Sequence, residues 1–248
     1  MAFGRIVRVY STAPSGAQDA NDPTLFTRKA TTNSAWGLLD YETSKRGGGG
    51  LDYKNFDIQS FIDLNTYCSA SITSVTDGSS QPRWTFNGAI ADKHSFQDWE
   101  RLICIGANCT VPFVDVNGKL KVRALKKETP VSGSVPFFSD KSGTASERSI
   151  IWQNGQSTLR KFRKSIFELP NRIVVNYTEQ DSLGNYIRTS GIMDDEVSQR
   201  RLGEVLGDNS IRVISKTTDL VGLTTRDEAA RAATLLLRAG EFAAGGQS

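Results

Sequence analysis

Four ionisable residues gather around the start of a predicted helix, where they could carry out acid–base chemistry. They are Asp92, His94, Asp98 and Glu100. Carboxyl groups do such chemistry when their environments separate their pKa values. A helix N-terminus, however, attracts acidic residues through its dipole alone. Because the chain also contains neither Gly-x-Ser-x-Gly nor His-Glu-x-x-His, we predict a structural role for this cluster and no catalytic residue.

The cysteines could contribute to a metal site. Four residues separate Cys104 from Cys109, but the only further ligands, Cys68 and His94, lie at irregular spacings. A structural zinc ion requires four ligands, and cysteine is among the most frequently buried residue types. We therefore predict core cysteines, with no metal ion and no cofactor.

The run of glycines from Gly47 to Gly50 could be taken for a phosphate-binding loop. Such a loop follows a buried strand, precedes a helix and carries Gly-Lys-Ser/Thr. Here a helix comes before the glycines and no Gly-Lys-Ser/Thr exists in the chain. The pattern instead predicts the end of a helix followed by a flexible loop.

A short basic and aromatic segment is the candidate contact surface. Its members are Arg160, Lys161, Phe162, Arg163, Lys164 and Phe167. Single-stranded nucleic acid can bind to such a mixture of charge and aromatic rings. The whole chain is close to neutral, at +3 from 30 basic and 27 acidic residues, which favours a solvated edge or a contact between subunits over specific nucleic-acid binding.

Composition sets the class of protein. A chain of 248 residues with 38% hydrophobic content can bury a large core. It has no run approaching the ~18 apolar residues of a membrane span and no signal-peptide core at its N-terminus, so we expect a soluble protein that is not secreted by the usual route. An odd number of cysteines, three, indicates a reducing compartment.

The elements that must position these residues form two α+β units. We predict an N-terminal arm over 1–32, a first domain over 33–127, a linker over 128–158, a second, β-rich domain over 159–241 and a tail over 242–248. The arm is broken by Pro, Gly, Asp and Asn and is expected to hold one strand, over 4–10.

The first domain is predicted to hold three helices and a hairpin. Asn33 or Ser34 caps the first helix, the second runs over 52–69, and Ser95 with Asp98 opens the third as a near capping box. A strand is expected over 83–88. Asn117-Gly118 joins two short strands, which is a strong hairpin signal.

The second domain is predicted to be an antiparallel sheet with one helix. Strands are expected over 172–178, 186–190 and 211–216. Thr225-Arg-Asp-Glu228 is a capping box that opens the last helix. The fold class is therefore α+β with antiparallel pairing, and not a βαβ wrap.

Several motifs, in the same order along the chain, resemble a known family. The first is Asn33-x-Ala-Trp36-x-Leu-x-Asp40, followed by Arg46-Gly47-x-Gly. The others are the helix ending in Tyr67-Cys68, Pro82-Arg83-Trp-Thr-Phe-Asn87, the strand from Asn171 to Tyr177, and Gly222-Leu-Thr-Thr-Arg226 ahead of an alanine-rich helix. This order over residues 33–240 resembles the hub region of bacteriophage tail-tip (tip attachment, host-specificity) proteins of the J family.

The resemblance implies a structural protein of the virion, made in the host cytoplasm and placed at the tail tip. Such hubs close the distal end of the tail tube as homotrimers and contact other baseplate proteins, such as the tail tube, tape measure and distal tail proteins. Contact with a host receptor is expected only through parts that longer family members carry. Three-fold rings use two different faces of each subunit, and we expect the basic and aromatic segment and the arm to provide them. A cell-wall hydrolase and a nucleic-acid-binding module remain the alternatives.

Overall fold

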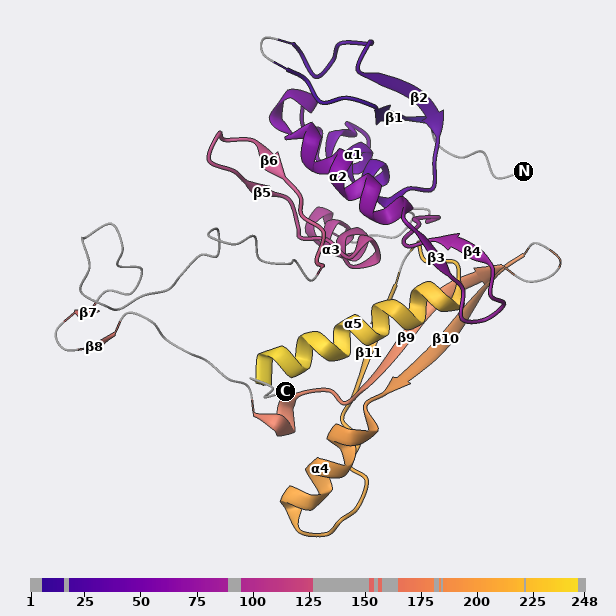
Figure 1. The fold of residues 1–248 in the computed structure, drawn as a ribbon, viewed down its shortest axis with the longest axis vertical. Helices are drawn as coiled ribbons and strands as arrows, with labels where there is room; N and C mark the ends of the chain where they lie inside the picture. Colours follow the sequence, from indigo (N-terminus) through magenta and orange to yellow (C-terminus); the bar gives the residue numbers. More distant parts are fainter. Residues whose placement is uncertain are drawn as a thin grey trace.

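The computed structural model describes residues 6–15, 18–88, 95–126, 152–153, 156–157, 165–180, 183, 185–220 and 222–244. Helices and several small sheets alternate along these ranges (Figure 1), which confirms the α+β class.

The N-terminal segment folds back on its own chain. Strand β1 (Ile6–Tyr10) pairs antiparallel with β2 (Phe26–Ala30), and β1 contacts helix α1 (Ser34–Thr43). Val7, Tyr10 and Leu25 are buried in the main core. The strand predicted over 4–10 is present as β1, but the segment predicted as an arm packs on the first domain of its own chain, because Val7 and Tyr10 of β1 join the core against α1.

Three helices form the centre of the first half. Helix α1 lies against both α2 (Ile58–Ser69) and α3 (Phe96–Ala107). Their shared core includes Trp36, Leu39, Phe61, Leu64 and Ile103. The second helix begins later than predicted, because Asp57 caps it and residues Tyr53–Asn55 form a separate 3-10 turn, η1, capped by Asp52.

The strand predicted over 83–88 does not form. The ladder of β3 (Ser71–Thr73) and β4 (Ser80–Pro82) ends before it, and Thr85 makes only a single bridge to Asn33. Its backbone N–H groups bond to separate segments: Trp84 donates to the Cys68 carbonyl, Phe86 to Thr32 and Asn87 to Gly222. This segment is a junction between elements rather than a member of one sheet.

The hairpin predicted at Asn117-Gly118 is confirmed, with a longer loop than expected. Strands β5 (Phe113–Val114) and β6 (Leu120–Lys121) pair antiparallel. The Asp115 carboxylate accepts hydrogen bonds from the backbone N–H groups of Asn117 and Lys119, and Gly118 has φ +75°. Within the predicted linker, β7 (Trp152–Gln153) pairs with β8 (Gln156–Ser157).

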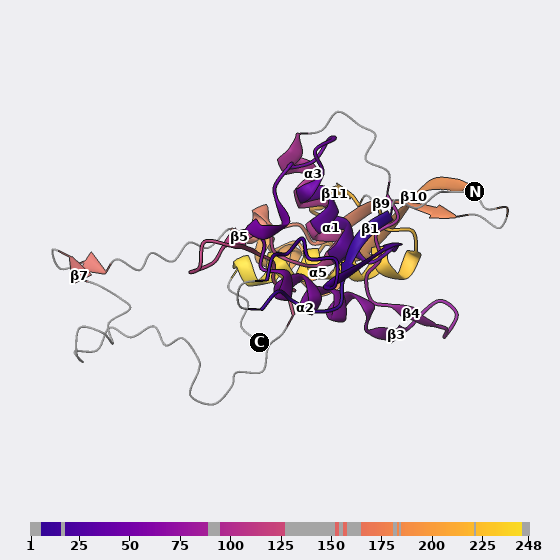
Figure 2. The ribbon, with the colours of Figure 1, turned by 90° about the horizontal axis from the view of Figure 1, so that it is seen from above.

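The second half is a three-stranded sheet in the order β10-β9-β11, after a 3-10 turn, η3 (Ile166–Glu168). The predicted pair β9 (Arg172–Gln180) and β10 (Tyr186–Asp194) is antiparallel over its whole length. Helix α5 (Arg226–Ala244) lies along β9 and β10 on one face (Figures 1 and 2).

Two predictions about this half are wrong. Strand β11 is Ser215–Asp219, not 211–216, and it pairs with β9 in parallel. The reason is an unpredicted helix, α4 (Glu196–Leu206), which carries the chain from β10 around to the other edge of β9. The Asn171 side-chain oxygen accepts a hydrogen bond from the Ile214 N–H, and the Asn171 N–H donates to the Ile214 carbonyl. Strand β11 begins at the next residue, Ser215.

Candidate assembly interface

Asn33 and Trp36, the first motif residues, join two helices. The Asn33 side-chain oxygen accepts a hydrogen bond from the Ala35 N–H and caps α1, while its amide donates to Ser69 Oγ at 2.9 Å on α2. Trp36 is buried, and its indole N–H donates to Asn65 Oδ1 at 3.0 Å. Asp40 is half-buried on the same helix. The side chains of Asn33 and Trp36 therefore hold α1 and α2 together.

The glycine run starting at Gly47 closes the end of α1 rather than forming a flexible loop. The N–H groups of Gly49 and Leu51 donate to the carbonyls of Tyr41 and Glu42 at 3.1 Å each. A Cβ at Gly48 would lie 2.0 Å from the Tyr41 carbonyl oxygen. Only glycine allows the chain to run this close to the helix end.

The motif residues Arg83 and Asn87 lie in the junction segment. The Arg83 guanidinium stacks over the Tyr67 ring. The backbone carbonyl of Arg83 accepts a hydrogen bond from the Arg231 side chain of α5 at 2.9 Å. The Asn87 N–H donates to Gly222 and its side chain to Thr224. Arg226, by contrast, is exposed at the start of α5.

Asp227 and Glu228 attach α5 to the first half. From the sequence they were predicted only to belong to a capping box. The Asp227 carboxylate accepts hydrogen bonds from the Val75 N–H, the Thr76 hydroxyl and the Gln81 amide. Hydrogen bonds from Ser74 and Thr76 lower the pKa of Asp227 to about 2. Burial raises the pKa of its neighbour Glu228. The capping-box spacing pointed to Glu228, but nothing local pointed to its distant partners.

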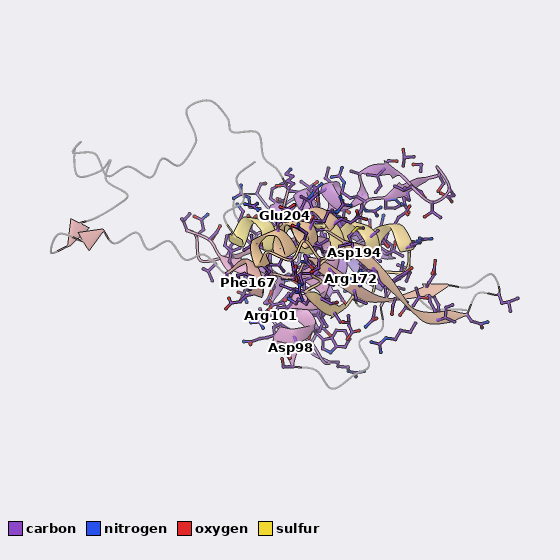
Figure 3. All side chains as sticks on the ribbon, turned by 90° about the horizontal axis from the view of Figure 1, so that it is seen from below. Asp98, Arg101, Phe167, Arg172, Asp194 and Glu204 are labelled. Carbon is purple, nitrogen blue, oxygen red and sulfur yellow. The ribbon has the colours of Figure 1, made fainter. Side chains whose placement is uncertain are left out.

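Asn171 and Tyr177 hold the sheet together. Asn171 is buried; its amide donates to the Arg212 carbonyl and its oxygen accepts from the Ile214 N–H at 2.7 Å. Tyr177 is buried under α5, and burial raises the pKa of its phenol. On the open face of the sheet, Arg172 forms a two-bond ion pair with Asp194, and the two lie side by side in Figure 3.

The predicted contact segment lies mostly outside the described residues. Residues 160–164 are among those not described. Phe167 lies on η3 and is 48% exposed.

Two other parts of the chain, which the sequence did not single out, each carry several exposed apolar side chains. The hairpin β5–β6 and the residues just before it expose Val111, Phe113, Val114 and Val116. Helix α4 and the loop after it expose Val197, Val205, Leu206, Ile211 and Val213. Single exposed apolar residues are ordinary, whereas groups of them are typical of surfaces that other molecules cover.

The group of Asp92, His94, Asp98 and Glu100, for which a structural role is predicted, is only partly described. Asp92 and His94 lie outside the described residues. Asp98 belongs to the predicted cap: its N–H donates to Ser95 Oγ, and the Ser95 hydroxyl donates to Asp98 Oδ2 at 2.6 Å. This confirms Ser95 as the start of α3.

One carboxyl group missed by sequence reasoning has a strongly shifted pKa. Glu42, near the end of α1, is 2% exposed, and burial raises its pKa to about 8, with a further contribution from Glu100 of α3. No residue in the described part of the chain donates a hydrogen bond to its Oε1 atom. This environment favours the protonated form of the Glu42 carboxyl.

The prediction of core cysteines is confirmed. Cys68, Cys104 and Cys109 are free thiols inside the core, and burial raises the pKa of Cys68 to about 12. Among the described residues no three His, Cys, Asp or Glu side chains come together as a metal site would require.

No described helix has the length and apolar character needed to cross a membrane. Comparison of the sequence with the models of known protein families and with curated proteins gives no match.

Proposed function

We propose that this chain is a structural protein of a bacteriophage tail tip, which assembles as a homotrimeric hub at the distal end of the tail tube and contacts the neighbouring tail proteins. The order of the family motifs over residues 33–240 is the starting point of the proposal. On this proposal the protein works by covering surfaces, and it has no catalytic centre.

The positions of the motif residues support a structural role. The side chains of Asn33, Trp36 and Asn171 cap or link elements through hydrogen bonds. Asn87, although exposed, bonds to Thr224, and the Arg83 guanidinium stacks over Tyr67. Side chains that bind a substrate would instead present polar groups to a shared opening. The observation that best supports the proposal is that these motif residues lie where separate elements of the fold contact each other.

The apolar groups on β5–β6 and α4 support assembly. Stable interfaces bury roughly 1,600 Å² and have apolar centres. A ring needs two different faces on each subunit, and these two groups lie on separate elements far apart along the chain (Figure 1).

Light scattering on the purified full chain tests the proposal. We expect a particle of three times the 27.1 kDa chain mass, seen as a three-fold ring in negative-stain images. Val205→Asp combined with Leu206→Asp on α4 is expected to lower the trimer fraction at least tenfold. Leu183→Asp is the control, because Leu183 is more exposed than either residue but lies on the turn between β9 and β10. A protein that stays monomeric at micromolar concentration would contradict the proposal.

A further inference from the structure

Strand β10 is an unusually open sheet edge. In the described part of the chain it pairs only with β9, on one side (Figure 1). All nine of its residues are exposed or half-buried. Every second N–H and C=O of an edge strand points away from the sheet, ready to pair with another strand.

The edge also lacks several of the features that normally prevent such pairing. Proteins protect edges with proline, lysine, bulges or short strands. Residues Tyr186–Asp194 include no proline and no lysine, and their register with β9 is unbroken over nine residue pairs. Ile187 and Ile192 stay exposed on this strand.

The charges along β10 are self-complementary. Arg188 lies three residues before Gly191, and Asp194 lies three residues after it. Both side chains are on the open face of the sheet, where Arg188 pairs with Asp219 at 2.5 Å and Asp194 pairs with Arg172 at 2.6 Å. An antiparallel pair of two copies centred on Gly191 places each Arg188 opposite the other copy's Asp194.

We propose that β10 pairs antiparallel with β10 of a second copy, about a two-fold axis at Gly191, to form a continuous six-stranded sheet. Side chains directly opposite on such strands have Cβ atoms about 4.5–5.5 Å apart. The two new Arg188–Asp194 contacts then extend the existing ion pairs into an alternating row of charges. Shifting the register by two residues places Arg188 opposite Ile192 in one direction and beyond the end of the strand in the other, so the charges select one alignment.

This contact is independent of the proposed ring. A three-fold ring joins two different faces, whereas a two-fold contact joins the same strand of two copies. Two rings, or two free subunits, can therefore meet through β10.

Cysteine cross-linking of the full chain tests the register. In Gly191→Cys the two new thiols face each other, within the Cα separation that a disulfide needs. A Cβ at this position would lie 3.5 Å from Val175 and 3.8 Å from Tyr177, which are ordinary contacts, so the variant is expected to fold. The native cysteines are buried and do not compete. Mild oxidation is expected to give a band of twice the chain mass on a non-reducing gel.

Ser190→Cys is the matched control. In the proposed register Ser190 faces Ile192 of the second copy, and the two copies of residue 190 are diagonal neighbours about 7–8 Å apart. We expect its cross-linking yield to be at least fivefold lower than that of Gly191→Cys. Equal yields, or no cross-link at position 191, would overturn the proposal.

Charge reversal provides a second test. Arg188→Glu and Asp194→Arg should each lower the fraction of paired species measured by light scattering, whether dimers of single chains or pairs of rings, since each places like charges opposite one another. Mixing the two variants should restore it, because each position 188 in a mixed dimer again faces a side chain of opposite charge at position 194. Failure of the mixture to recover, with both variants folded by circular dichroism, would also count against the pairing. Trimer formation measured separately bears only on the proposed function.

Discussion

Glu228 and Thr85, 143 residues apart in the chain, meet in the interior. The Glu228 carboxylate accepts hydrogen bonds from the Thr85 N–H at 2.7 Å and from its hydroxyl at 2.8 Å. Its second oxygen accepts from Thr225 at 3.1 Å, so the same side chain closes the capping box of α5. With Glu228 only 1% exposed, this contact joins the last helix to the junction segment of the first half.

Glu228→Ala should lower the free energy of unfolding by about 3 kcal/mol, because it leaves the Thr85 N–H buried without an acceptor. Urea denaturation followed by circular dichroism measures the change. The control is Glu196→Ala, which removes an exposed pair with Arg200 on α4 and should cost no more than about 0.5 kcal/mol. Equal losses in the two variants would mean that the buried contact contributes little.

Asp227 should make the protein sensitive to acid. Its pKa is lowered from 3.8 to about 2 in the folded chain, so the unfolded chain binds more protons between these values. Its contribution to stability is therefore complete above about pH 4 and is lost as the pH falls toward 2. Asp227→Asn should show a smaller loss of stability between pH 4 and 2 than the native chain does. If both proteins lose the same stability between pH 4 and 2, other carboxylates are responsible for the loss.

Glu42 should make the protein less stable as the pH rises, whereas Asp227 makes it less stable as the pH falls. Its folded pKa of about 8 lies above the ordinary 4.5, so the folded chain binds more protons in this window and stability falls as the pH rises from about 4.5 to 8. Glu42→Gln removes the ionisable group and should raise the free energy of unfolding at pH 8 by about 1–3 kcal/mol, with little effect at pH 5. Glu204→Gln, at an exposed position on α4, should leave the profile unchanged. A pH profile of denaturation midpoints separates the two variants.

Gly48 should be far less tolerant than its neighbour Gly50. Gly48→Ala drives a methyl group into the Tyr41 carbonyl and should cost about 3 kcal/mol or more. Gly50 has φ +66° but open space around it, so Gly50→Ala should cost only about 1–2 kcal/mol. Thermal melts of the two variants compare them directly. A smaller loss at Gly48 than at Gly50 would contradict the packing described for the end of α1.

Local signals in the sequence were enough to predict several elements. The capping boxes at Ser95 and Thr225 start α3 and α5 where expected, since each depends on side chains within one helical turn. The alternating strands on either side of residues 181–185 pair as predicted. The cysteines are buried as their residue type suggests.

The tertiary structure alone decided what depends on distant partners. The direction of β11 follows from the path through α4, and the course of residues 84–87 follows from hydrogen bonds to three separate segments. The N-terminal hairpin is too short to bury its apolar residues by itself, and Val7 and Tyr10 become part of the core because β1 lies against α1. Sequence patterns indicate which residues prefer to be buried or to cap a helix. They do not indicate which distant donors will reach a carboxylate such as Glu228, because those contacts form only when remote parts of the chain come together.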